Sequence, residues 1–260
     1  MRVILFSIGS FQLPGYSACI LLGGAIATLL GLLRVRKNPA LNVYDFIALE
    51  AAGVLGGLLG AKGLYLFVNA GSIEWARLLR DAAYFGQIMT GGFVFYGGLL
   101  GAIVVLFGAY LIFRVPVLTY FEEIVHLLPL AHAFGRMGCF LAGCCYGIPY
   151  DGPLAVTFPV DNPYTLGGEP LFPVQLVEAA CLLVISLVTW LVARKKHWIG
   201  VPVYLMLYAP VRFALEYFRY DAERGGLGPF STSQWISLAL FVAATTYLVV
   251  RSLRERRTVR

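Results

Sequence analysis

Arg136, Arg212 and Glu216 lie inside strongly apolar stretches of this chain, where ionisable side chains are costly and therefore indicate function. The i,i+4 spacing of Arg212 and Glu216 places both on one face of a helix. Arginine presents a planar fork of donors that matches phosphate oxygens. Two such arginines predict a phosphate site, and the abundant phosphates of a membrane belong to phospholipids. Two structural alternatives stay open: Arg212 and Glu216 could form an ion pair that only joins helices, and Arg136 could reach toward lipid headgroups.

Three of the five cysteines fall within seven residues, at Cys139, Cys144 and Cys145. A buried cysteine usually acts as a small apolar residue, which is the interpretation we give Cys19 and Cys181. For the cluster, a disulfide is a second interpretation. A disulfide between Cys139 and Cys144 is the better candidate, because a bond between the adjacent Cys144 and Cys145 would be strained.

A third interpretation makes one clustered cysteine a nucleophile, because Arg136 would lower the pKa of a nearby thiol. His132, one helical turn before Arg136, could act as a base or be a neutral core residue. A metal site lacks a fourth ligand unless His132 joins the three cysteines. A metal site is therefore the least favoured interpretation of the cluster.

Glycines bracket the aromatic hydroxyl of Tyr96, with Gly97 and Gly98 directly after it. They could leave room for a ligand, or they could let two helices approach closely. Several glycines between 53 and 63 favour close helix packing there.

The composition indicates a membrane protein. The 260 residues are 59% hydrophobic and 13% charged, with a mean hydropathy of +0.78, whereas a soluble domain has about 25% charged residues. These values exclude an ordinary cytosolic enzyme, a disordered chain and, despite the net charge of +6, a nucleic-acid binder. A bilayer span needs roughly 20 apolar residues. Seven stretches qualify: 16–33, 46–69, 89–113, 118–138, 174–193, 199–218 and 233–250. The predicted fold is an all-α integral membrane protein, with residues 1–260 as one transmembrane domain.

Basic residues predict the orientation of the spans, because cytoplasmic loops are rich in lysine and arginine. One set of alternate loops holds twelve of them: Arg34, Arg36, Lys37, Arg114, Arg194, Lys195, Lys196, Arg251, Arg254, Arg256, Arg257 and Arg260. The other set holds five: Arg2, Arg77, Arg80, Arg219 and Arg224.

This asymmetry predicts an outside N-terminus, a cytoplasmic C-terminus and an extracytoplasmic loop at 148–172. Residues 1–15 lack the features of a removable signal peptide, so we expect them in the mature protein. The polar residues of the spans then gather in the outer leaflet: Tyr16, Lys62, Tyr96, Arg136, Gln175, Glu178, Arg212 and Glu216.

Five motifs resemble those of the prolipoprotein diacylglyceryl transferases and keep their order. G-R-M-G-C-F-L-A-G-C-C-Y-G at 135–147 is similar to the family signature G-R-x-G-N-F-x-N-x-E-x-x-G. The others are G-G-F-V-F-Y-G-G-L-L-G-A at 91–102, P-V-Q-L-V-E at 173–178, R-F-A-L-E-Y-F-R at 212–219 and S-Q-W-I-S at 233–237. Tyr16 also falls where the family has a tyrosine in its first span.

The resemblance implies a multi-pass enzyme of the bacterial inner membrane that needs no metal and no organic cofactor. Such enzymes move the diacylglyceryl group of phosphatidylglycerol to a cysteine thiol of a prolipoprotein signal peptide and release glycerol phosphate. It implies phosphate contacts for Arg136 and Arg212, an orienting role for Glu216, and headgroup binding or proton transfer for Tyr16. The further substrate-binding candidates by the same motifs are Gly97, Gly98, Gly147 and Gln175.

This sequence departs from the family pattern at five positions, and these departures affect the expected thiol acceptor more than the phospholipid donor. Tyr96 replaces a histidine, Cys139 an asparagine, Ala142 a second asparagine, Cys144 a glutamate and Phe172 another histidine. Tyrosine has a pKa of about 10 and is a poor base at neutral pH. We therefore keep Tyr96, Cys139 and Cys144 as catalytic candidates beside the two arginines.

Three alternative functions follow from these departures. One is a phospholipid-modifying transferase with a different acceptor, working through a cysteine intermediate. The second is a membrane thiol oxidoreductase that cycles the cysteine cluster. The third is a lipid-binding or transport protein without chemistry.

Overall fold

The computed structural model describes residues 4–8, 11–162, 164–195, 197–220 and 226–258. Within these, five helices are long and apolar enough to cross a membrane: α1 (Gly15–Val35), α2 (Val43–Val68), α5 (Phe95–Phe113), α8 (Val174–Ala193) and the Thr232–Glu255 part of α10 (Thr232–Thr258). The bent pair α6 (Val117–Ile124) and α7 (Leu127–Ala142) makes a sixth if it is one span. The prediction of a helical, multi-pass membrane protein is confirmed. Of the basic residues used for orientation, Arg2, Lys196, Arg224 and Arg260 lie outside the described residues.

The predicted span 118–138 is a broken helix, because α6 and α7 meet at 61°. Pro129 has no N–H to donate to the carbonyl of Val125, so a continuous helix would lack a hydrogen bond at this point, which favours a kink or a break. The carbonyl of His126 at the break accepts a 2.7 Å hydrogen bond from Ser186 Oγ on α8. A polar side chain on a neighbouring helix thus satisfies a backbone group that the break exposes.

The predicted span 89–113 begins later than the sequence indicated, because α5 starts at Phe95. Before it, α4 (Ala82–Thr90) ends at the paired glycines, and Gly92 has a φ of +64°. The ammonium of Lys62 donates to the carbonyls of Ile88 at 2.8 Å and Gly92 at 2.9 Å, and to that of Gly91. Lys62 therefore caps the C-terminal end of α4.

The predicted stretch 199–218 corresponds to α9 (Gly200–Glu216), which has 17 residues and follows the short 3-10 helix η1 (His197–Ile199). A short helix α3 (Trp75–Leu78) precedes α4. Three antiparallel strand pairs were not predicted. They are β1 (Ile4–Ile8) with β2 (Phe11–Pro14), β3 (Val156–Thr157) with β4 (Pro170–Leu171), and β5 (Gly226–Leu227) with β6 (Phe230–Ser231).

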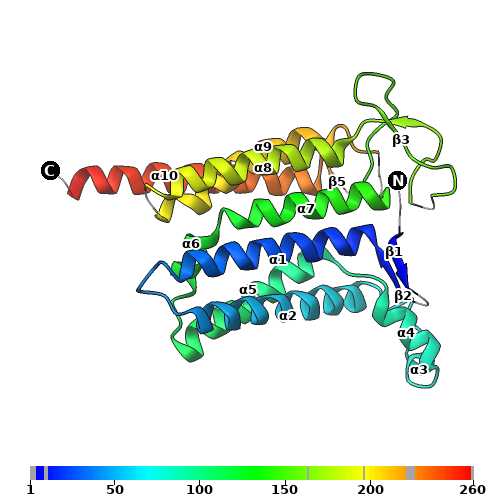
Figure 1. The fold of residues 1–260 in the computed structure, drawn as a ribbon, viewed down its shortest axis with the longest axis horizontal. Coiled ribbons are helices and arrows are strands. Elements are labelled where there is room, and N and C mark those ends of the chain that lie inside the picture. The colour runs from blue at the N-terminus through cyan, green and yellow to red at the C-terminus, as the bar shows by residue number, and fades with distance from the viewer. Residues whose placement is uncertain (1–3, 9–10, 163, 196, 221–225, 259–260) are drawn as a thin grey trace. The chain divides into compact units, whose positions relative to one another are not determined.

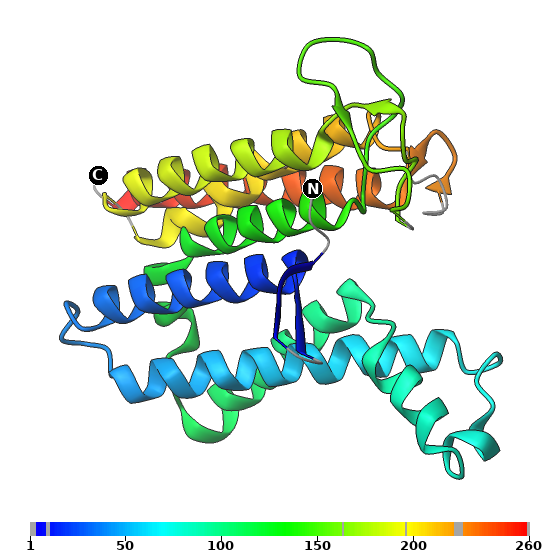
Figure 2. The same cartoon turned by 45° about the vertical axis from the view of Figure 1, so that its right-hand side comes forward.

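The chain divides into two compact units, Met1–Arg34 with Glu122–Arg260, and Val35–Phe121. In the first unit α1, α7, α8, α9 and α10 run side by side (Figure 1). The loop that contains β3 and β4 lies at the end of this bundle where α7 finishes (Figure 2). Consecutive helices of the series α7, α8, α9 and α10 pack against each other.

In the second unit α2 and α5 pack through glycines. A Cβ added at Gly60 would collide with the carbonyl oxygen of Gly97 and lie 2.8 Å from the Cα of Gly101. A Cβ at Gly98 would lie 3.2 Å from the carbonyl oxygen of Gly57. Only residues without side chains allow this separation, so the glycines fix the spacing of the two helices.

Candidate active site

Arg136 on α7 is held by a buried carboxylate of the next helix. Its Nε lies 3.1 Å from Oε2 of Glu178 on α8, and the Glu178 side chain is 1% exposed. The other carboxylate oxygen, Oε1, accepts a 2.8 Å hydrogen bond from the hydroxyl of Tyr208 on α9. Three helices therefore contribute to one chain of contacts that fixes the guanidinium of Arg136.

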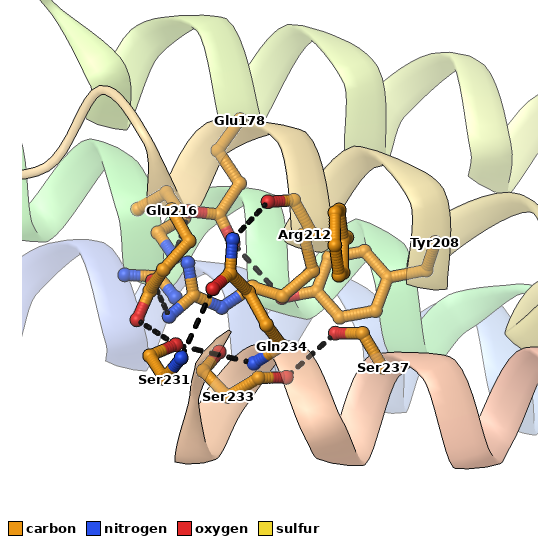
Figure 3. A network of polar contacts seen from close by, with 10 residues as sticks. Glu178, Tyr208, Arg212, Glu216, Ser231, Ser233, Gln234 and Ser237 are labelled. Atoms are coloured by element: carbon orange, nitrogen blue, oxygen red, sulfur yellow. Dashed lines mark hydrogen bonds and ion pairs between the residues drawn. The ribbon is translucent and has the colours of Figure 1, made fainter. Parts of the chain in front are cut away.

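Arg212 and Glu216 form the ion pair that their spacing indicated, with 2.7 Å between Arg212 Nη2 and Glu216 Oε2. Glu216 Oε1 also accepts a 2.9 Å hydrogen bond from Ser231 Oγ. The backbone N–H of Ser231 donates to Gln234 Oε1 at 3.0 Å. Figure 3 shows these side chains gathered between α9 and the start of α10.

Arg212 retains hydrogen-bonding capacity in this network. The residue is buried, and its Nη1 has no hydrogen-bond partner among the residues that the structure describes. An unmet donor in a buried position is costly unless a ligand satisfies it. A phosphate oxygen is a suitable acceptor, because a hydrogen bond between two charged groups is short and strong.

His132 links the two arginines electrostatically. Its imidazole interacts with the charges of Arg136, Glu178 and Arg212, and its ring meets the Tyr208 ring edge-on, with 5.3 Å between centroids. Charges on α7, α8 and α9 therefore act on one side chain within the helical bundle.

Tyr16 lies in the first turn of α1, next to the end of α7. A Cβ at Gly138 would lie 3.1 Å from the carbonyl oxygen of Tyr16 and 3.2 Å from the Cβ of Cys19, so the absence of a side chain at Gly138 allows α1 and α7 to meet. The Tyr16 hydroxyl interacts electrostatically with Arg136 and with Cys139. The structure thus brings Tyr16 and Arg136 to the same end of the bundle.

Gln175 has a partner within the protein, because its Nε2 donates a 2.8 Å hydrogen bond to the carbonyl of Cys144. Gly147 is buried where two segments cross, and a Cβ there would collide with the carbonyl oxygen of Phe172 and lie 2.8 Å from that of Phe218. Both residues therefore shape the loop after α7.

The sulfur atoms of Cys139, Cys144 and Cys145 all lie within 4.8 Å of one another. Among the described residues, this is the one group of three potential metal-ligating side chains that close together. None of the five cysteines forms a disulfide in the structure. Two features distinguish this cluster from Cys19 and Cys181: its sulfur atoms lie close together, and it spans the end of α7 and the loop that follows.

Tyr96, Gly97 and Gly98 belong to the second unit, in the first turn of α5. Tyr96 is 42% exposed and packs edge-on against Phe95. Gly97 and Gly98 face α2, and a Cβ at Gly97 would collide with the carbonyl oxygen of Gly60. Helix packing, one of the two interpretations of these glycines, accounts for both positions.

Tyr208, Ser231 and Gln234 were not predicted from the sequence to belong to the site. A signal for Tyr208 existed, because it lies four residues before Arg212 and hence on the same face of α9. No comparable periodic signal marks Ser231, which lies in the two-residue strand β6.

Comparison with known proteins identifies the family. The family model described as prolipoprotein diacylglyceryl transferase matches residues 3–250. A phosphatidylglycerol–prolipoprotein diacylglyceryl transferase 2 of Clostridium perfringens is 30% identical over 259 residues, covering 99% of this chain and 98% of that protein. The corresponding transferase of Clostridium tetani is 32% identical over 241 residues, covering 92% and 93%. That of Nitrosomonas europaea is 31% identical over 257 residues, covering 94% and 88%. This chain belongs to the prolipoprotein diacylglyceryl transferase family.

Proposed function

We propose that this protein transfers the diacylglyceryl group of phosphatidylglycerol to a cysteine thiol of a prolipoprotein. Family membership over nearly the whole chain supports the reaction, and the relatives are named for these two substrates. The observation that most directly supports the donor is the buried Arg212, whose Nη1 has no hydrogen-bond partner among the described residues although its Nη2 is paired with Glu216. Arg136 and Arg212 bind the phosphate, Glu178 orients Arg136, and Glu216 orients Arg212.

The chemistry requires charge stabilisation at the leaving phosphate. The acceptor sulfur attacks the terminal glyceryl carbon of the donor, a carbon–sulfur bond forms, and the carbon–oxygen bond to phosphate breaks. Glycerol phosphate leaves with the bonding electrons, and the thiol proton passes to a base. Prepositioned guanidinium groups stabilise the charge that grows on the departing phosphate. Their network of buried carboxylates keeps them oriented before substrate binds.

The thiol proton has two candidate acceptors. His132 lies against Tyr208 and interacts with both arginines, while Tyr96 stands at the position of the family histidine. The two single variants His132→Gln and Tyr96→Phe show which of these side chains accepts the proton. The variant that lacks the base loses transfer at neutral pH and recovers part of it at high pH, where the acceptor thiol ionises unaided.

We propose that α9, although short, completes seven spans with an outside N-terminus and a cytoplasmic C-terminus. Its 17 residues rise about 25 Å, close to the thickness of a hydrocarbon core. The basic residues of alternate loops favour this orientation. It places the loop at 148–172 outside the cell, beside the end of α7. The proposed location is the bacterial inner membrane.

A direct assay tests the proposed reaction. The purified protein is incubated with phosphatidylglycerol and a synthetic signal peptide with one cysteine, and both the peptide mass and free glycerol phosphate are followed. We expect a diacylglyceryl mass gain on the peptide and an equal amount of glycerol phosphate. Rescue of a strain depleted of its own transferase is the matching test in cells. Absence of both with folded protein contradicts the proposal.

The alternative function, a phospholipid-modifying transferase that works through a cysteine intermediate, predicts different results. Intact mass of the protein after incubation with phosphatidylglycerol alone would show a lipid adduct that Cys144→Ser removes. Glycerol phosphate release without a change in the peptide would also favour that alternative. A redox-dependent change in thiol count without lipid turnover would favour the oxidoreductase.

A further inference from the structure

The cysteine cluster is built by the way α7 ends. Gly143 adopts a left-handed conformation with a φ of +82°, and its N–H donates to the carbonyl of Cys139 at 2.9 Å. The N–H of Cys144 donates to that same carbonyl at 3.1 Å. This turn folds the chain back over the last turn of the helix. The sulfur atoms of Cys139 and Cys144 consequently approach each other although five residues separate them.

Cys145 adopts an unfavourable backbone conformation within this turn. Its φ is +57°, and a residue with a Cβ in the left-handed region costs about 1–3 kcal/mol. Gln175 holds the preceding residue from the side of α8, through its 2.8 Å hydrogen bond to the carbonyl of Cys144. The turn is therefore fixed by contacts on both sides, and it holds the third sulfur near the other two.

Two arginines act electrostatically on the cysteine cluster. Arg136 and Arg219 both interact electrostatically with Cys145, and Arg136 also with Cys139. Positive charge beside a cysteine favours its thiolate, which is the form that binds a metal.

The dimensions suit an ion with three sulfur ligands. A metal–sulfur bond of about 2.3 Å places three ligands of a planar site about 4.0 Å apart. The sulfur atoms here lie within 4.8 Å of one another, so contraction by less than about 0.8 Å closes the site. Zinc prefers four ligands, and His132 does not belong to the group. Thiolates select soft ions, of which cuprous copper accepts three-fold coordination.

We propose that Cys139, Cys144 and Cys145 form a three-thiolate site for a soft monovalent metal ion, of which Cu(I) is the natural representative. Binding replaces up to three thiol protons by one ion, and no electron is transferred. The ion would lie beside Arg136 and fix the turn after α7. The three cysteines lack the fourth ligand that a tetrahedral metal site needs, but a three-coordinate ion needs none. This proposal does not depend on the transferase reaction.

The test uses the full chain, purified in detergent and reduced. Anaerobic titration with Cu(I) in competition with bicinchoninate measures affinity and stoichiometry. We expect one copper for each chain. Single replacements Cys139→Ser, Cys144→Ser and Cys145→Ser each weaken binding more than about 100-fold, since even indirect changes around a metal cost 10–100-fold. Cys181→Ser is the matched control, because Cys181 lies outside the cluster, and it binds as the wild type does.

X-ray absorption at the copper edge tests the site without any variant. We expect three sulfur neighbours at about 2.3 Å. Two sulfur neighbours, copper uptake that survives all three replacements, or no retained copper each overturns the proposal. So does a Cys139–Cys144 disulfide that persists in the wild-type protein after reduction. If a serine variant fails to fold, the absorption measurement on the wild type still decides.

Discussion

The guanidinium of Arg136 and the carboxylate of Glu178 form a buried ion pair between α7 and α8, with 3.1 Å between Arg136 Nε and Glu178 Oε2. Removing one partner of such an ion pair is costly, because the other charge is left without a partner in the low-dielectric interior. The pair therefore does two things at once. It joins two helices, and it determines where the Arg136 guanidinium points.

Glu178→Gln should slow transfer through Arg136 rather than by loss of a reacting group. The neutral amide keeps the size of the side chain but removes its charge, so we expect a destabilisation of about 3–5 kcal/mol and a transfer rate lower by about 100-fold. Thermal unfolding and the phosphatidylglycerol assay measure the two effects. Tyr208→Phe is the control, because it removes only the 2.8 Å hydrogen bond to Glu178 and keeps the ion pair.

A wild-type rate in folded Glu178→Gln would show that Arg136 does not need this carboxylate. A rate loss in Tyr208→Phe as large as that in Glu178→Gln would place the dominant effect in the hydroxyl instead. The kcat and KM for phosphatidylglycerol separate these outcomes, since misplacing a phosphate ligand affects the transition state more than ground-state binding.

The glycine contact between α2 and α5 predicts opposite effects at two nearby positions. Gly60→Ala places a methyl group against the carbonyl of Gly97, so we expect about 1–3 kcal/mol of destabilisation. A methyl group at Gly63 meets nothing within 4 Å, so Gly63→Ala should stabilise the helix by up to about 1 kcal/mol. Unfolding in detergent compares them. Equal stability of the two variants would mean that the helices do not pack through Gly60.

The contacts of Asp81 predict that the first turn of α4 is less stable at acid pH. Its carboxylate accepts hydrogen bonds from the N–H groups of Ala83 at 3.0 Å and Tyr84 at 3.1 Å. The Tyr84 bond and the ion pair with Arg77 lower the pKa of Asp81 below its usual range. The stabilisation is therefore complete above the ordinary aspartate pKa of about 3.9 and is lost as the pH falls through the lowered value.

Protection of the Ala83 and Tyr84 amides from hydrogen exchange measures this effect. We expect protection to fall at acid pH in the wild type. In Asp81→Asn the side-chain oxygen still accepts the bonds but does not titrate, so protection should be independent of pH. The same acid-dependent loss in both proteins would exclude Asp81 as its cause.

Long apolar segments were predictable from the sequence. The stretches 16–33 and 174–193 correspond to α1 and α8 within a few residues, because both are predominantly apolar over a length that spans a bilayer core. Hydropathy did not show the break before Phe95, which depends on Lys62 capping α4 from a different helix. Such breaks are set by contacts between segments, and a single-sequence profile contains no information about them.

The site was partly predictable for a similar reason. The spacing of Arg212 and Glu216 indicated their ion pair directly, since both lie on one helix. The partner of Arg136 could not be deduced that way, because Glu178 comes from another helix and approaches only through packing. The proximity of Cys145 to Cys139 depends on the left-handed conformation of Cys145 itself. A cysteine at this position does not indicate such a conformation, whereas a glycine would.

The most direct test of the phosphate-binding role is the transfer rate of Arg212→Lys. Lysine keeps the positive charge beside Glu216, so the helix contact remains, but it lacks the planar fork whose Nη1 has no partner among the described residues. We predict that kcat for phosphatidylglycerol falls by about 100- to 1,000-fold, with thermal unfolding close to that of the wild type. A wild-type rate in folded Arg212→Lys would contradict the proposal that this guanidinium binds the departing phosphate.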